Sequence, residues 1–187
     1  MKTLFEDKII RLVDMSAENT AFLLANSVQK QFAKGDVIAV EGKVCTNCWF
    51  IEDGYLRATT TKDGKEIHLN FWLEDTFASN LKSMRTQAVS EFSIVAGEKT
   101  RVREFEGAML LKLYERSPQF ESFGRKLLEE LLIEQEEHIN LFKLTTPTER
   151  YQYIVKHKPK LLQRISLTML SSYLGISRET LSRIRKR

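Results

Sequence analysis

Hydrophobic positions along this 187-residue chain change their spacing twice, which divides the chain into three parts. Residues 4–26 place apolar side chains at roughly helical spacing, and Ser16 can cap a helix, so one or two short helices are expected there. Short apolar runs separated by turn residues follow, to about residue 113. From residue 118 onward the spacing is helical again. The pattern predicts an α+β protein with a β domain in its N-terminal part and an all-α C-terminal part.

The β part is marked by recurring turn dipeptides, which are Gly35-Asp36, Glu41-Gly42, Asp53-Gly54 and Asp63-Gly64. Strand-like runs lie between and after them, at residues 48–51, 55–61, 66–72, 92–96, 102–105 and 109–113. In residues 66–72, the apolar Ile67, Leu69 and Phe71 alternate with polar residues, which is the period of a half-buried strand. Short strands at regular spacing predict an antiparallel β sandwich or barrel.

A long helix is predicted from residue 118 to residue 142. One stripe along it steps by four, three, four and three residues, and its members are Leu128, Leu132, Gln135, Ile139 and Phe142. That spacing is the heptad seam of a two-helix contact. The favoured interpretation is a helix that pairs with its twin in a homodimer. The alternative is a helix packed only against its own β domain.

The sequence Thr145-Thr146-Pro147-Thr148-Glu149 ends this helix and begins another, because proline fits the first turn of a helix and a preceding threonine can cap it. Three parts are therefore expected: a β domain at 1–116, a long helix at 117–144 that is the candidate dimer helix, and a C-terminal helical domain at 145–187.

Residues 167–186 fit a helix-turn-helix, in which two short helices cross at a steep angle. Ser171 is small enough for the crossing point, Gly175 tolerates a positive φ at the turn, and Ser177 can cap the second helix. The apolar residues expected to join both helices to a common core are Leu170, Leu174, Ile176, Leu181 and Ile184.

The second helix would be the recognition helix in the DNA major groove. Its predicted base-contacting face consists of Arg178, Glu179, Ser182 and Arg183. Arginine can bind guanine bidentately, and glutamate can accept a hydrogen bond from cytosine. The predicted phosphate contacts are Ser177, Lys186 and Arg187. The alternatives are ordinary surface charge for the arginines and, for Glu179, an acid that favours the helix N-terminus.

Charge is distributed unevenly along the chain. Residues 143–187 hold 11 Lys and Arg against 2 Asp and Glu, whereas the rest of the chain has more acids than bases. This asymmetry indicates an anionic partner at the C-terminal end. The sequence contains neither a signal peptide nor an apolar run of about 18 residues, so a cytoplasmic protein without membrane contacts is expected.

The sequence contains few residues in patterns typical of catalytic or metal sites. Cys45 and Cys48 lack a second ligand pair, so two reduced thiols are expected rather than a metal site. Only His68 falls within the β part, which excludes a His-rich metal site there, and there is no Gly-rich phosphate loop. No enzyme activity, metal or cofactor is predicted. The remaining alternative to a DNA-binding regulator is a sensor or scaffold whose basic tail binds another acidic partner.

Several motifs together resemble the Crp/Fnr family of transcription regulators. Residues 175–184, GISRETLSRI, are similar to that family's recognition element, and the turn motifs at 34–36, 41–42, 50–54 and 63–66 resemble its cyclic nucleotide-binding roll. The resemblance covers roughly residues 10–187. It implies a jelly-roll sensor, a homodimer formed through the long helix, a palindromic DNA operator and contact with RNA polymerase.

The effector site departs from the family pattern. Members that bind cyclic nucleotides have a Glu for the ribose and an Arg for the cyclic phosphate, and here Ser79 and Phe92 stand in their places. The expected effector pocket consists of Phe77, Ala78, Ser79, Asn80, Phe92 and Ser93. Without the arginine the phosphate loses a charge-assisted contact. We therefore expect no response to cyclic AMP, and either an unknown small-molecule effector or a constitutively competent protein.

The C-terminal part is also shorter than in larger members. Residues 158–165 leave little room for the β-hairpin wing of those proteins. A compact domain of this kind resembles family members from Bacteroidetes.

Overall fold

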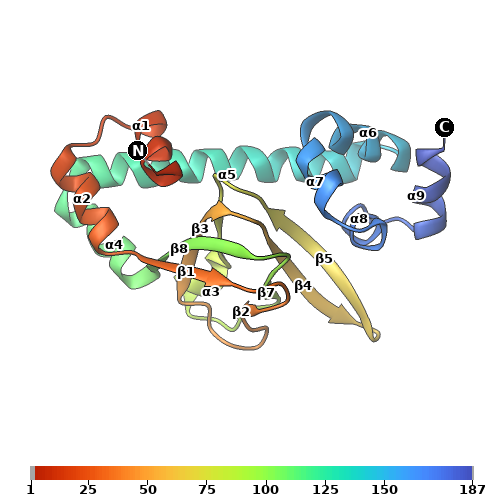
Figure 1. Cartoon of the computed structure of the whole chain (residues 1–187), viewed down its shortest axis with the longest axis horizontal. Coiled ribbons are helices and arrows are strands. Elements are labelled where there is room, and N and C mark those ends of the chain that lie inside the picture. The colour runs from red at the N-terminus through yellow and green to blue at the C-terminus, as the bar shows by residue number, and fades with distance from the viewer. Residues whose placement is uncertain (1–2, 187) are drawn as a thin grey trace.

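The computed structural model describes residues 3–186 and is organised around one long helix, α5 (Pro118–Leu144) (Figure 1). The N-terminal helices lie at one end of α5 and the C-terminal helices at the other, with a β roll beneath its middle. Ser117 caps α5 by accepting a hydrogen bond from the Gln119 amide. Within the described residues, no helix is long and apolar enough to cross a membrane.

Two four-stranded antiparallel sheets form the roll. The strands are β1 (Val28–Phe32), β2 (Val37–Ala39), β3 (Asn47–Asp53), β4 (Leu56–Lys62), β5 (Lys65–Trp72), β6 (Phe77–Ala78), β7 (Ser93–Ala96) and β8 (Thr100–Glu106). One sheet has the order β1-β8-β3-β6 and the other β2-β7-β4-β5. Trp49, Ile51, Leu56 and Ile94 are among the buried residues of the roll's own core. The turn spacing predicted a sandwich or barrel of short strands and the family resemblance implied a jelly roll, and the antiparallel roll is confirmed.

A second apolar cluster attaches helices to the roll. The helices in this part of the chain are α1 (Leu4–Leu12), α2 (Ala17–Ala25), α3 (Leu81–Thr86) and α4 (Gly107–Arg116). Phe5 of α1 is fully buried, and its ring centroid lies 5.1 Å from that of Phe50 and 5.2 Å from that of Phe105. Phe123 brings α5 into the same cluster. Aromatic packing thus fixes α1 and the N-terminal half of α5 on the roll.

The strand expected at residues 109–113 is wrong, because this segment lies in α4. Met109, Leu110 and Leu113 pack on the second cluster, and their spacing of one and three residues places them on one helical face. Leu111 and Tyr114 are exposed. Residues 107–116 contain no β-branched side chain, so helix propensity and packing agree.

The strict alternation expected along β5 is also wrong. His68 is buried, whereas 41% of Leu69 is exposed. In the β4–β5 ladder Ala58 pairs with Asn70 and Thr59 pairs with His68, so Leu69 is an extra residue in a β-bulge. A bulge shifts the side-chain alternation by one residue, and the two faces of the strand exchange there.

Four helices complete the chain: α6 (Pro147–His157), α7 (Pro159–Arg164), α8 (Leu167–Tyr173) and α9 (Arg178–Arg185). A capping box between Thr146 and Glu149 begins α6. A third cluster unites these helices, and its fully buried members include Ile154, Leu161 and Leu174. Up to residue 186 no strand follows β8, which agrees with the expected lack of a wing.

Candidate functional site

Helices α8 and α9 form the two arms of the predicted helix-turn-helix. Gly175 has φ +64° at the turn, where an added Cβ would be strained. Ser171 is buried at the crossing, and its hydroxyl donates to the Thr168 carbonyl at 2.9 Å. Ser177 caps α9 by accepting the Thr180 amide hydrogen bond at 3.1 Å. Ser171, Gly175 and Ser177 therefore have the crossing, turn and capping roles that the sequence predicted for them.

The apolar side of α9 faces the domain core and its charged side faces outward. Leu181 is completely buried, together with Leu170 and Leu174 of the preceding segment. The predicted apolar partners Ile176 and Ile184 are half-buried. Arg178, Glu179, Arg183 and Lys186 are exposed, and Ser182 is half-buried. Figure 1 shows α9 at the far end of the molecule, away from the roll.

Some predicted contact residues already have partners within the protein. The Ser177 hydroxyl is used in the cap, and it also donates to the Thr180 hydroxyl at 3.0 Å. The pKa of Glu179 is lowered, first by a hydrogen bond from its own backbone amide and then by one from Ser177. This engagement favours the helix N-terminal role that was the alternative for Glu179. Arg187 lies outside the described residues.

Contacts that the sequence analysis missed join the C-terminal helices to α5. Arg150 donates to the carbonyl oxygens of Leu174 at 3.1 Å and Phe142 at 3.3 Å, and its guanidinium lies 5.0 Å from the centre of the Phe142 ring. Lys158 pairs with Glu134 of α5 at 2.9 Å. These bases belong to the charge excess at the C-terminal end, yet they have partners within the chain.

The same helices also pack against the roll, which the sequence did not indicate. Arg164 pairs with Glu74 at 2.9 Å and with Glu98, and its guanidinium lies 5.2 Å from the ring centre of Tyr55. Burial tends to raise the pKa of Glu74, but the hydrogen bond from Arg164 and further hydrogen bonds outweigh it, so that pKa is lowered. Glu74 is therefore held as a carboxylate.

Aromatic contact reinforces this attachment. Phe71 of β5 meets Tyr173 of α8 edge to face, with ring centroids 5.3 Å apart. The His68 amide donates to the Ser172 hydroxyl at 3.0 Å. Burial lowers the pKa of His68, with a smaller opposing contribution from Glu66. The imidazole is therefore held neutral beside this contact.

The predicted dimer seam is largely uncovered. Exposed fractions are 48% for Leu128, 70% for Leu132 and 48% for Ile139, and Gln135 is also exposed. Phe142, the last member of the stripe, is half-buried beneath Arg150. Three large apolar side chains thus line one face of α5 without a covering element from the described chain.

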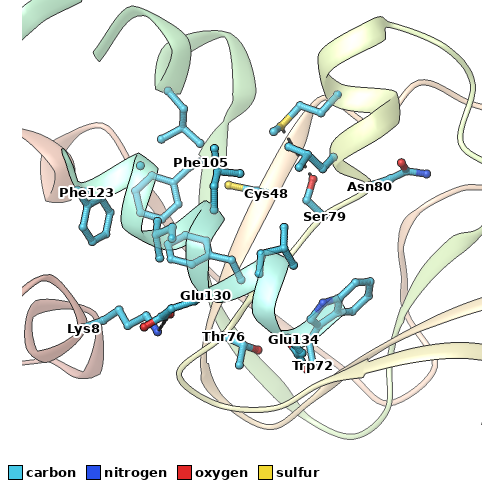
Figure 2. Close-up of a pocket in the computed structure, with 18 of the residues that line it drawn as sticks. Lys8, Cys48, Trp72, Thr76, Ser79, Asn80, Phe105, Phe123, Glu130 and Glu134 are labelled. Atoms are coloured by element: carbon cyan, nitrogen blue, oxygen red, sulfur yellow. Dashed lines mark hydrogen bonds and ion pairs between the residues drawn. The ribbon is translucent and has the colours of Figure 1, made fainter. Parts of the chain in front are cut away.

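A cavity of about 540 Å³ lies between the roll, α1, α4 and α5, and Figure 2 shows it from within. Four of the expected pocket residues line it, namely Phe77, Ser79, Asn80 and Phe92. Ala78 is fully buried in the roll core and Ser93 is bonded to the Glu41 amide, so neither reaches the cavity. Residues of α1, α4 and α5 that complete the wall were not predicted, because only the fold brings them there.

Ion pairs and buried groups determine the polarity of this cavity. Lys8 points to Glu130, and their charged atoms are 2.6 Å apart (Figure 2). The thiol of Cys48 is buried, and burial raises its pKa to about 12, so it is neutral. Cys45 is a free thiol in the roll core. Within residues 3–186, no cluster of His, Cys, Asp or Glu has the arrangement of a metal site.

Comparison with known proteins gives an independent view of this fold. The cyclic nucleotide-binding domain family matches residues 29–117. FixK2 from Bradyrhizobium japonicum is similar over 86% of this chain and 83% of its own, with 20% identity and a TM-score of 0.70. A protein of the Crp/Fnr family from Eubacterium rectale has 17% identity and a TM-score of 0.69, covering 92% of this chain and 83% of its own.

The catabolite activator protein of Thermus thermophilus has 22% identity and a TM-score of 0.56, covering 92% of this chain and 83% of its own. The search of curated proteins found no match. Residues 29–117 therefore match the cyclic nucleotide-binding domain family, and the chain shares the overall fold of these regulators.

Proposed function

We propose that the protein is a DNA-binding transcription regulator of the Crp/Fnr type, with a sensor domain at 1–116, a dimerisation helix at 117–144 and a DNA-binding domain at 145–187. The observation that carries the proposal is the helix-turn-helix, in which Leu181 is buried and Arg178 and Arg183 are exposed on α9. Such a helix can enter the major groove, where Arg178 can bind a base directly and Arg183 can do so by exchanging its 3.3 Å hydrogen bond to the Thr180 hydroxyl. Its place of action is the cytoplasm, where DNA and RNA polymerase are its partners.

The bases that are exposed on α9 support this assignment. Arg178, Arg183, Arg185 and Lys186 form no ion pair within the described chain. By contrast, Lys158 and Arg164, elsewhere in the same domain, are paired with carboxylates. Four bases without an ion pair thus lie close together on and directly after the helix that would face DNA, where they can displace counterions from phosphates.

A second copy of the chain is the proposed partner of the exposed α5 seam. The heptad spacing of Leu128, Leu132 and Ile139 suits a parallel helix pair, and these apolar side chains are exposed in the single chain. Dimerisation would place two α9 helices about 34 Å apart, one turn of DNA, which requires a palindromic operator. A signal in the sensor domain would change that spacing through a shift of population.

Cyclic AMP is not the proposed effector. Ser79 donates its hydroxyl to the Asn47 carbonyl, and Phe92 packs against the roll core. Lys82, a nearby base, is paired with Glu91 on the surface. Among the described residues that line the cavity there is no arginine. A cyclic phosphate would therefore lack the charge-assisted contact that compensates for its loss of hydration.

Selection from a random duplex library, followed by fluorescence anisotropy on the enriched sequence, tests the DNA-binding function. We expect a palindrome whose affinity falls steeply with salt. Arg183→Ala should weaken specific binding by about 1–3 kcal/mol, because one base contact is lost. The matched control is Lys156→Ala, an exposed base on α6, which should bind as the parent does. A library without enriched sequences would contradict the proposal and favour another acidic partner.

Leu132→Asp tests the dimer in the same preparation. This residue is 70% exposed in the single chain, so the substitution should leave the fold intact and prevent helix pairing. We expect sedimentation equilibrium to show a dimer for the parent and a monomer for Leu132→Asp. Ile133→Asp is the matched control, since Ile133 is 59% exposed but lies off the seam. A monomeric parent, or a variant that remains dimeric, would refute the seam.

A further inference from the structure

The wall of the 540 Å³ cavity is mostly apolar. From the roll come Leu69, Trp72 and Phe92, and from α5 come Leu127 and Leu131, among others. A volume of this size is typical of sites for small organic ligands. Figure 2 shows Trp72 on one side of the cavity and Phe105 with Phe123 on another. An occupant would therefore gain mainly from removing its apolar surface from water.

Cations on the wall are not available to an anionic ligand. Lys8 is the one Lys or Arg among the lining residues described, and it is 7% exposed and already bonded to Glu130 at 2.6 Å. Two further lining acids, Asp75 and Glu134, are paired with bases that lie outside the cavity. An anion would have to break one of these pairs or remain without a counter-charge, and both are costly in a low-dielectric site.

Three neutral polar side chains of the wall, those of Thr76, Ser79 and Asn80, are also engaged. The Thr76 hydroxyl donates to the Leu73 carbonyl at 2.7 Å, and the Ser79 hydroxyl to the Asn47 carbonyl at 3.1 Å. The Asn80 side chain accepts from the Ser83 amide and donates to the Ser90 hydroxyl. These three groups are satisfied by the protein itself. Asn70, whose side-chain oxygen accepts from the Phe71 amide, and Tyr114 and Gln135 also line the cavity, so a ligand would meet a few neutral polar groups on a mostly apolar wall.

We propose that this cavity binds a neutral, largely apolar small molecule, and that such a molecule is the effector of the regulator. The proposal rests on the function proposed above and assigns its ligand class. A bound ligand could also affect dimer packing, because Leu128 and Gln135 belong both to the cavity wall and to the predicted seam. An occupant in contact with them biases how two α5 helices pack.

Two fluorescent probes of nearly the same shape test the ligand class. N-phenyl-1-naphthylamine is neutral, and 8-anilinonaphthalene-1-sulfonate is the same ring system with an added sulfonate. With the full-length protein, we expect saturable binding of the neutral probe and at least about tenfold weaker binding of the sulfonate, which corresponds to about 1.4 kcal/mol. Cyclic AMP should displace neither. Equal binding of both probes, stronger sulfonate binding or displacement by cyclic AMP would overturn the proposal.

Two variants of lining residues, Leu131→Trp and Leu69→Arg, test whether the probe binds in the cavity, and a third variant, Ile133→Trp, is the control. Leu131→Trp fills the space from α5 and should weaken binding of the neutral probe at least about tenfold. Ile133→Trp adds the same side chain to the exposed side of α5 and should leave binding unchanged. Leu69→Arg, at a residue that is 41% exposed and lines the cavity, supplies a free cation and should make the sulfonate the better ligand. Unchanged binding in Leu131→Trp and Leu69→Arg would place the probe elsewhere and refute the site.

The Arg183→Ala variant separates this proposal from the DNA-binding function. It should bind the neutral probe as the parent does, since no described residue of α9 lines the cavity, and α9 lies at the opposite end of the molecule from α1 (Figure 1). If the parent binds its operator but not the neutral probe, the ligand class fails and the regulator remains. If the parent binds the probe but no operator, the cavity still has the proposed ligand class, but the ligand is not the effector of a DNA-binding regulator.

Discussion

The roll meets its neighbours at two contacts of opposite character. Toward α5 it leaves a cavity of about 540 Å³ with an apolar wall. Toward the C-terminal helices the contact is filled, with Phe71 against Tyr173 and with Arg164 between Glu74 and Glu98. A hollow contact can change when a ligand enters it, whereas a packed and ion-paired contact holds two parts in a fixed relation. The proposed sensing and the attachment of the C-terminal helices are thus assigned to different sides of one roll.

Two residues on β5 provide the strongest test of this difference. Phe71→Ala should lower the free energy of unfolding by about 3–5 kcal/mol, because the residue is 5% exposed within the filled contact. Leu69→Ala should cost less than about 1 kcal/mol, since that side chain borders the open cavity. Urea denaturation followed by circular dichroism measures both. Similar losses for the two variants would mean that the contacts do not differ in packing.

Arg164→Ala should have the next largest effect. Its side chain is 19% exposed and those of Glu74 and Glu98 are 27% and 39% exposed. A pair of this kind lies between the buried and surface cases, so we expect a loss of about 2–3 kcal/mol. The exposed Lys160 on the same helix is the matched control, and Lys160→Ala should stay within about 0.5 kcal/mol of the parent. Equal stability of the two variants would show that the Arg164 pairs contribute nothing.

The smallest effect that we predict is a loss of stability between about pH 7 and pH 5.5. Burial lowers the pKa of His68, opposed by Glu66 and aided by Arg57. Burial also lowers the pKa of His138, and the charge of Lys158 lowers it further while that of Glu134 opposes the shift. Both imidazoles are therefore neutral in the folded protein at pH values where the unfolded chain begins to bind protons. Their contribution is present above the ordinary pKa of 6.5 and decreases as the pH falls below it.

The urea midpoint as a function of pH measures this effect. The double variant His68→Gln and His138→Gln should show a weaker dependence across the same range, because neither side chain then titrates. His157→Gln, which replaces an exposed histidine at the end of α6, is the control for the substitution itself. An unchanged slope in the double variant would assign the dependence to other groups.

Local patterns were sufficient for most elements but not for their surroundings. The helix-turn-helix could be predicted because Ser171, Gly175 and Ser177 each meet a conformational requirement set by their immediate neighbours. Residues 109–113 were misread as a strand, since a short apolar run has the same appearance in a strand and in a half-buried helix. The side-chain alternation of β5 failed at Leu69, because the bulge arises from pairing with β4 and leaves no mark in β5 itself.

The sequence by itself determined the order of the elements, the capped turn before α9 and the apolar stripe along α5, because all three depend on spacing within a single segment. Only the tertiary structure decided that Arg150, Lys158 and Arg164 hold the C-terminal helices instead of remaining free surface charges. It also decided that α1, α4 and α5 enclose the cavity. Both outcomes depend on residues far apart in the chain, which approach one another only when the roll, α5 and the C-terminal helices pack together.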